Sequence, residues 1–330
     1  MRITFQDEHG NNEAGVDGGG LFKEFLTSLI KIAFDPAYAL FRETADHFMY
    51  PNPEAELMID FDQHMQYFGF IGRVIGKALY DGIQIEPRFT NFFLRAILGQ
   101  YNFLDDLQTL DPEMYKSLIF LKSYEGDFED LGLTFSITRA ALGENREVDL
   151  IPNGSQIAVT RDNLSRFLYL MADYKLNKEI AKQSSVFFAG LRQVVELKWL
   201  NMFAADELGT LLSGSERIDF KDLQANTTYT GGFSASHELI IWFWEIMETL
   251  DPSSCAQFLK FVTSCPRAPL LGFKTLNPGF SIQHVGNNQH SLPTAATCFN
   301  LLRLPRYMSK QLLREKLLYA IHSGTGFELS

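Results

Sequence analysis

The stretch Leu292-Pro293-Thr294-Ala295-Ala296-Thr297-Cys298-Phe299-Asn300 places a thiol in a short polar segment near the end of the chain. The apolar run that follows it, Leu301, Leu302 and Leu304, is typical of a strand. A cysteine that packs in a core usually has apolar neighbours, whereas threonines and an asparagine surround Cys298. Because a polar, accessible site favours the reactive thiolate, the sequence predicts that Cys298 is exposed. Two roles remain open at this point, a nucleophilic or redox thiol and a surface thiol without function.

Length and composition indicate a globular protein with room for two domains. The chain has 330 residues, of which 46% are hydrophobic and 21% are charged. No apolar run reaches the about 18 residues that a membrane span requires. Residues 1–5 have the alternation of a strand and lack the apolar core of a signal peptide. We therefore expect no membrane partner.

Charge and cysteine usage exclude further classes of function. The net charge is −11, and binding to phosphates requires a basic surface, so we expect no nucleic-acid partner. Cys255, Cys265 and Cys298 have neither metal-ligand spacing nor a disulfide pattern, so no metal site is expected. Free thiols are typical of reducing compartments, which predicts a cytoplasmic or nuclear location. Gly18-Gly19-Gly20 lacks the spacing of a nucleotide-binding loop and follows Asp17, so no cofactor is expected.

Apolar residues at helical spacing predict helices along most of the chain. We expect them at residues 21–34, 67–80, 88–98, 112–121, 161–174, 178–200, 205–212, 237–250, 252–262 and 309–322. Gly69, Gly72 and Gly76 stand three and four residues apart in the second of these, which favours close packing against another helix. Short strands are expected at residues 133–138 and 146–151.

A polar stretch of small residues at 224–236 has the composition of a linker, with Gly231-Gly232 inside it. A break there gives parts of about 225 and about 100 residues, each long enough to bury its own core. The pattern also admits a single α/β domain with one long surface loop.

Six segments of the chain, in the same order, resemble those of the HECT family of ubiquitin ligases. They are residues 16–25, 50–53, 71–79, 172–177, 261–269 and 292–300. The ending Gly326-Phe327-Glu328-Leu329-Ser330 most resembles the subgroup of the family that shares it. In this family a cysteine accepts ubiquitin from a conjugating enzyme as a thioester and passes it to a lysine. The resemblance therefore implies that Cys298 carries the ubiquitin.

The resemblance implies an α/β fold of the α+β type with two lobes. The larger, mostly helical N-lobe would span residues 1–226, and the smaller α/β C-lobe residues 231–330. A hinge would lie at residues 227–230, and the conjugating enzyme would dock on a subdomain at roughly residues 100–180. Since one rigid body cannot easily bring the same thiol to a donor and to an acceptor, a hinge agrees with the chemistry.

The resemblance also implies roles for individual side chains. Thr297 would position the thiol or the thioester carbonyl, and Phe327 would anchor the tail against the first lobe. The tail would bring Glu328 and the terminal carboxylate of Ser330 near Cys298, where a carboxylate would either orient or deprotonate the incoming lysine. Five apolar residues match the groove that binds the conjugating enzyme: Met114, Leu118, Leu131, Leu133 and Phe167. Taken singly, each of the five is more typical of a core residue than of a docking surface.

The chain departs from the family in two places. Ala296 stands where many relatives carry a histidine, which rules out that residue as the base. The chain also begins almost inside its first strand, so we expect either an excised piece or a truncated product, with a first lobe that lacks a supporting helix.

The partners that the resemblance implies are ubiquitin, a conjugating enzyme, a protein substrate and the proteasome. Two other classes of function remain open. One is a binding module for ubiquitin or the conjugating enzyme that has no catalysis of its own. The other is a thiol hydrolase that pairs Cys298 with His290.

Overall fold

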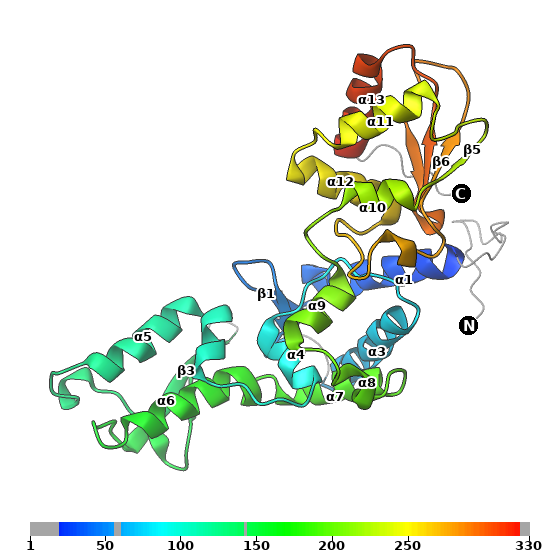
Figure 1. Cartoon of the computed structure of the whole chain (residues 1–330). Helices are drawn as coiled ribbons and strands as arrows, with labels where there is room; N and C mark the ends of the chain where they lie inside the picture. The colour runs from blue at the N-terminus through cyan, green and yellow to red at the C-terminus, as the bar shows by residue number, and fades with distance from the viewer. Residues whose placement is uncertain (1–19, 56–60, 142–143, 324–330) are drawn as a thin grey trace. The chain divides into compact units, whose positions relative to one another are not determined.

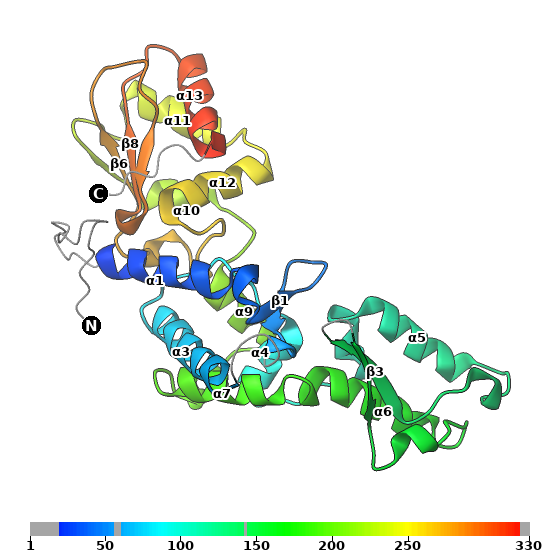
Figure 2. The same ribbon diagram turned by 180° about the vertical axis from the view of Figure 1, so that it is seen from behind.

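The computed structural model describes residues 20–55, 61–141 and 144–323 (Figures 1 and 2). These residues form two compact units, which are described separately below. Ala33–Lys77 and Pro87–Gly209 make up the first, called here the central unit. The remaining described residues make up the second, called the Cys298 unit. Helices and small sheets occur together in the chain, as expected for the predicted α+β class.

The central unit is mostly helical, and its strands form two small hairpins. The first hairpin pairs β1 (Phe41–Glu43) with β2 (Met49–Pro51), and the second pairs β3 (Ser136–Ala141) with β4 (Glu144–Asp149). The helices are α3 (Phe61–Tyr80, whose last turn belongs to the Cys298 unit), α4 (Asn91–Ile97), α5 (Pro112–Ser123), α6 (Leu164–Asp173), α7 (Ala181–Arg192), α8 (Leu197–Leu200) and α9 (Ala205–Ser213), with single turns η1 (Pro36–Tyr38), η2 (Leu104–Thr109), η3 (Glu129–Leu131), η4 (Gly154–Gln156) and η5 (Tyr174–Lys178).

Helices α3 and α7 pack with their backbones in contact. A Cβ atom on Gly72 would lie 2.0 Å from the carbonyl oxygen of Phe187, and one on Gly190 would lie 2.0 Å from the carbonyl oxygen of Gly69. Only residues without a side chain permit this approach. The close packing predicted from the glycine spacing of α3 is therefore confirmed.

The helix predicted at residues 178–200 is interrupted in the structure. α7 ends at Arg192, and α8 begins only at Leu197 after an extended residue, Glu196. The intervening Val194 and Val195 are β-branched and lose rotamer freedom in a helix, which favours a break at this point.

The Cys298 unit is built on a four-stranded sheet of order β5-β6-β8-β7. The three strands β5 (Thr228–Thr230), β6 (Ser281–His284) and β8 (Leu301–Leu304) run parallel, and β7 (Thr294–Ala296) pairs antiparallel with β8. The other elements of this unit are α1 (Gly20–Ala33), α10 (Phe220–Ala225), α11 (Glu238–Met247), α12 (Pro252–Thr263), α13 (Lys310–Ser323), η6 (Phe273–Thr275) and η7 (Thr297–Phe299).

The core of the Cys298 unit lies between the sheet and its helices. Figures 1 and 2 show α11, α12 and α13 beside the strands. Phe243 and Phe258 from these helices and Ile282 and Leu302 from the strands are fully buried in one apolar cluster. This core fixes the end of β7 and the start of β8, the two strands that flank Cys298.

The stretch predicted as a linker, residues 224–236, contains a strand of this sheet. Residues 228–230 of the predicted hinge form β5, which pairs with β6 through Thr228↔Ser281 and Thr230↔Gln283. Thr228 and Thr230 are exposed while Tyr229 between them is half-buried. An edge strand with one face in solvent has the same polar composition as a linker, which explains why the sequence did not predict the strand. The lobe boundaries at residues 226 and 231 stay a prediction.

Two further expectations concern the chain ends and the membrane. The strand predicted at residues 1–5 lies outside the described residues. Among the helices that the structure describes, none has both the length and the hydropathy needed to cross a bilayer.

Candidate active site

Cys298 lies at the centre of η7, a single turn of 3₁₀ helix that joins β7 to β8. Asn300 ends the turn in the left-handed region at φ 48°, a conformation that asparagine tolerates better than most residues. Its backbone N–H donates to the carbonyl oxygen of Thr297 over 3.3 Å and so closes the turn. The polar residues on either side of Cys298 therefore shape its backbone.

The prediction that Cys298 is exposed is wrong. Only 8% of the residue is exposed, whereas the neighbouring Phe299 is 37% exposed. The turn packs against α12. Asn300 is 1% exposed, and its side-chain N–H donates to the carbonyl oxygen of Pro278 over 2.6 Å. Polar sequence around the thiol thus marks a hydrogen-bonded turn instead of a solvent-exposed loop.

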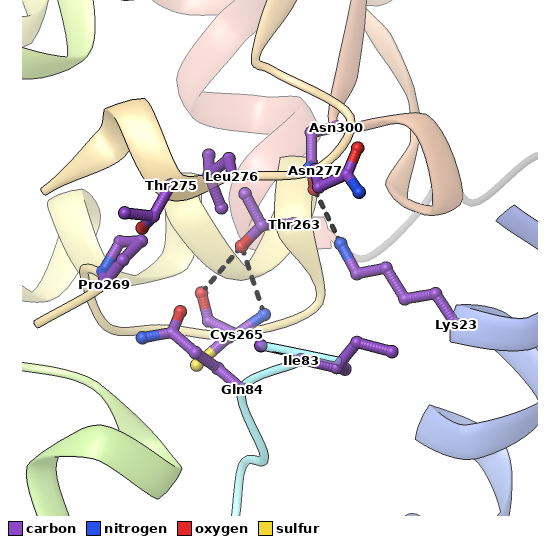
Figure 3. A pocket seen from close by; sticks show the side chains of 11 residues that line it. Lys23, Ile83, Gln84, Thr263, Cys265, Pro269, Thr275, Leu276, Asn277 and Asn300 are labelled. Atoms are coloured by element: carbon purple, nitrogen blue, oxygen red, sulfur yellow. Dashed lines mark hydrogen bonds between the residues drawn. The ribbon is translucent and has the colours of Figure 1, made fainter. Parts of the chain in front are cut away.

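A cation from α1 lies at this turn. The Lys23 ammonium donates to the backbone carbonyl of Thr297 over 3.0 Å and to Oδ1 of Asn300 over 2.6 Å. Figure 3 shows the Lys23 side chain extending from α1 to Asn300, near Cys265. Burial lowers the pKa of Lys23 from 10.5 to about 8, and the Cys265 and Cys298 thiols act in the opposite direction.

The other two cysteines lie where small packing residues are expected, as the sequence indicated. Cys255 on α12 is 8% exposed, and burial followed by the charge of Asp251 raises the pKa of its thiol. Cys265, just after α12, is 3% exposed, and burial raises the pKa of its thiol against the opposing charge of Arg267. Neither environment favours a thiolate nucleophile.

Four other predicted positions of the site have different outcomes. Thr297 precedes the thiol and uses its backbone carbonyl to bind Lys23. His290 is exposed, and within the described part of the chain no histidine hydrogen-bonds to Cys298. Phe327 and Glu328 lie outside the described residues.

The five apolar residues predicted for the docking groove line one groove in the central unit, with a volume of about 620 Å³. They come from α5, η3 and its following segment, and α6. Leu118 and Phe167 are buried at 4% and 3% exposure and form the base of the groove. Met114, Leu131 and Leu133 are half-buried. The structure thus brings the predicted set together.

The groove also has apolar members that sequence reasoning missed. Phe120 is 59% exposed on α5, while Leu121 on the same helix and Met171 on α6 are buried. Helical spacing places two of them on the same helix face as a predicted groove residue, because Leu121 follows Leu118 by three residues and Met171 follows Phe167 by four. Phe120 had no such signal.

The described residues show no metal centre, since no three or more of their His, Cys, Asp or Glu side chains are grouped so that they could hold an ion.

Comparison with known proteins identifies the family of this chain. The model of the HECT-domain (ubiquitin-transferase) family matches residues 27–330. The chain belongs to this family. The match includes both the Cys298 turn and the apolar groove.

Individual relatives match the chain along its whole length. E3 ubiquitin-protein ligase UPL6 of Arabidopsis thaliana is 46% identical over 336 residues, and the match covers 100% of this chain and 32% of UPL6. Ubiquitin-protein ligase E3B of Homo sapiens is 42% identical over 362 residues, covering 100% of this chain and 34% of E3B. E3 ubiquitin-protein ligase HUL5 of Saccharomyces cerevisiae is 43% identical, and the match covers 100% of this chain and 36% of HUL5. The chain thus spans about a third of the length of these relatives.

Proposed function

We propose that this chain acts as a ubiquitin-protein ligase that carries ubiquitin on Cys298. Membership of the HECT-domain family, whose description is ubiquitin-transferase, is the observation that carries the proposal. Cys298 is the cysteine in the turn between β7 and β8, and Lys23 binds this turn at the Thr297 carbonyl and at Asn300.

The reaction has two steps on the same sulfur atom. The Cys298 thiolate attacks the carbonyl carbon of the ubiquitin thioester on the conjugating enzyme, a new C–S bond forms, and the conjugating enzyme's thiolate leaves. A substrate lysine amine then attacks the new thioester, an isopeptide bond forms, and the Cys298 thiolate is released. The amine gives up one proton in this step, so a base near the thioester assists it.

The conjugating enzyme docks, in this proposal, on the groove of the central unit. An apolar groove with a partly exposed rim and a buried base is suited to an apolar loop or helix of a partner. The exposed Phe120 ring and the half-buried Met114 and Leu133 supply the rim. Phe167 and Leu118 support them from below.

Both steps require that partners reach a thiol that is 8% exposed. We propose that the lobes predicted at residues 1–226 and 231–330 move relative to each other, so that Cys298 meets the donor in one arrangement and the lysine in another. Phe327 and Glu328 act in the second arrangement, where Glu328 and the terminal carboxylate orient the lysine. Thr297 positions the thiol through its backbone.

The remaining partners follow from the family. A protein substrate accepts the ubiquitin, and degradation by the proteasome is the proposed outcome of the modification. The free thiols of Cys255, Cys265 and Cys298 support a reducing location, in the cytoplasm or the nucleus.

A product analysis separates this function from the two alternatives. The chain is mixed with a ubiquitin thioester of a conjugating enzyme, and the products are separated on non-reducing gels. A ubiquitin adduct that a thiol reductant removes supports a carrier. Retention of intact donor without an adduct would indicate a binding module, and rapid release of free ubiquitin without an adduct would indicate a hydrolase.

A further inference from the structure

The Lys23 ammonium binds both ends of the turn that holds Cys298. One acceptor is the carbonyl oxygen of Thr297, the residue before the cysteine, at 3.0 Å. The other is Oδ1 of Asn300, two residues after the cysteine, at 2.6 Å. We propose that Lys23 is a positioning residue for Cys298 in the step that forms the thioester, an inference that rests on the proposed function.

The two contacts reinforce a hydrogen bond that already closes the turn. The Asn300 N–H donates to the same Thr297 carbonyl oxygen that Lys23 binds, over 3.3 Å. The Asn300 side chain is fixed from its other end, because its Nδ2 donates to the Pro278 carbonyl. Lys23 therefore completes a connected set of polar groups around a residue that is 1% exposed, and such a set holds one geometry only when each member is satisfied.

Burial of this cation would be unfavourable without a compensating role. An ammonium loses hydration when it leaves water, and the lowered pKa of Lys23 reflects that loss. A lysine has three N–H donors, and the described residues provide two acceptors for them. The third can bind water in the cavity of about 30 Å³ that Lys23 and Asn300 help to line, which has room for about one molecule.

Helix α1 supplies a firm base for this contact. Leu26 and Ile30, three and seven residues after Lys23 on the same helix, are buried at 2% and 4% exposure. The ammonium thus extends from an anchored helix. Since Lys23 and Cys298 belong to the two lobes that are proposed to move, the contact acts in the arrangement in which the acyl group arrives, and Lys23 holds the turn of Cys298 there. Positioning of this kind contributes to rate because small displacements of a nucleophile are costly.

The test compares three variants with the wild-type protein. Lys23→Met keeps the length of the side chain and removes its charge and donors, while Lys23→Arg keeps both. Lys31→Met is the matched control, because Lys31 is an exposed lysine on the same helix. The single-turnover rate of adduct formation on Cys298 is measured for each protein from one ubiquitin-charged conjugating enzyme.

We expect Lys23→Met to transfer ubiquitin about tenfold or more slowly than wild type, since it loses hydrogen bonds from a charged donor. Lys23→Arg should recover at least half of the lost rate on a logarithmic scale, and Lys31→Met should match wild type. A rate for Lys23→Met within twofold of Lys31→Met overturns the inference. So does an equal loss in Lys23→Met and Lys23→Arg, because that result indicates packing alone.

Hydrogen exchange gives a second readout that does not depend on ubiquitin. The amide of Asn300 should exchange about tenfold faster in Lys23→Met, with unchanged exchange in α13. If wild type forms no adduct, the proposed function fails, and exchange alone then decides whether Lys23 holds the turn. Unchanged exchange at Asn300 in Lys23→Met overturns the inference.

Discussion

The Phe167 ring packs edge-on against the Phe135 ring, with their centroids 5.6 Å apart and their planes at 82°. Both residues are almost fully buried, at 3% and 1% exposure. Phe167 also lines the groove that we assign to the conjugating enzyme. One ring therefore belongs both to the core of the central unit and to its docking surface.

Because of this double role, Phe167→Ala should affect stability as well as docking. Loss of a buried phenylalanine typically lowers the free energy of unfolding by about 3–5 kcal/mol. Denaturant unfolding of the variant measures this loss. A stability within about 0.5 kcal/mol of wild type would show that Phe167 is not a core residue.

Phe120→Ala separates docking from stability. Phe120 is 59% exposed on the rim of the groove, so its removal should leave the free energy of unfolding within about 0.5 kcal/mol of wild type. The affinity for the conjugating enzyme should fall by about fivefold or more, as expected for an exposed aromatic anchor. Titration with labelled conjugating enzyme measures it. Tyr319→Ala, at 60% exposure on α13, is the control and should bind normally; equal affinities of the two variants would argue against this groove.

The contact between α3 and α7 predicts that alanine substitutions of two glycines on α3 lower the stability to different extents. A Cβ on Gly72 meets the backbone oxygen of Phe187 at 2.0 Å, which neither helix can relieve without moving. Gly72→Ala should therefore lower the free energy of unfolding by about 2 kcal/mol or more. The atom nearest to a Cβ on Gly69 belongs to the Val186 side chain, at 3.2 Å, and alanine favours the helix, so Gly69→Ala should cost less than about 1 kcal/mol. Thermal or denaturant melts compare them, and equal losses would contradict the packing.

Lys23 should make stability depend on pH in the alkaline range. Its pKa is about 8 in the folded chain and 10.5 when unperturbed, so between these values the unfolded chain binds a proton that the folded chain lacks. Stability from this group then rises with pH, by up to about 1.4 kcal/mol per unit, and is constant at its lowest below pH 8. The Cys265 and Cys298 thiols face the ammonium in wild type, and both thiols are also present in the Lys23→Met variant. From pH 7.5 to 10, the free energy of unfolding of wild type should therefore rise relative to that of Lys23→Met. A difference between the two proteins that stays constant with pH would contradict the lowered pKa.

Removal of residues 327–330 should separate the two steps of the reaction. Phe327, Glu328 and the terminal carboxylate are proposed to act on the incoming lysine and not on the conjugating enzyme. The shortened chain should form the thioester at the wild-type rate and discharge it to lysine at least about tenfold more slowly. Pulse-chase assays follow the two rates separately. Loss of thioester formation in a folded shortened chain would assign the tail to the first step.

Local pattern was sufficient to predict much of the fold. Apolar spacing predicted helices at 21–34 and 252–262, close to α1 (Gly20–Ala33) and α12 (Pro252–Thr263). The glycines of α3 predicted a close helix contact because their effect depends on a short, repeated spacing. Leucines 301, 302 and 304 predicted β8 for a similar reason.

The features that the sequence did not predict depend on residues far apart along the chain. Cys298 is buried because its turn meets α12 and a lysine 274 residues before Thr297. Neither contact has a local signal, and the polar neighbours of Cys298 therefore indicated solvent. β5 looked like a linker because its pairing partner, β6, lies some 50 residues later, about Ser281. Composition alone does not distinguish an exposed edge strand from a loop.

The most direct test of the central claim is a single-turnover transfer from a ubiquitin-charged conjugating enzyme to wild type, Cys298→Ala and Cys255→Ala. Cys255 is as buried as Cys298, at 8% exposure, and serves as the matched control. We predict a reductant-sensitive ubiquitin adduct on wild type and Cys255→Ala and none on Cys298→Ala, with the modified peptide containing Cys298. An adduct of equal yield on folded Cys298→Ala would contradict the assignment of this residue as the carrier.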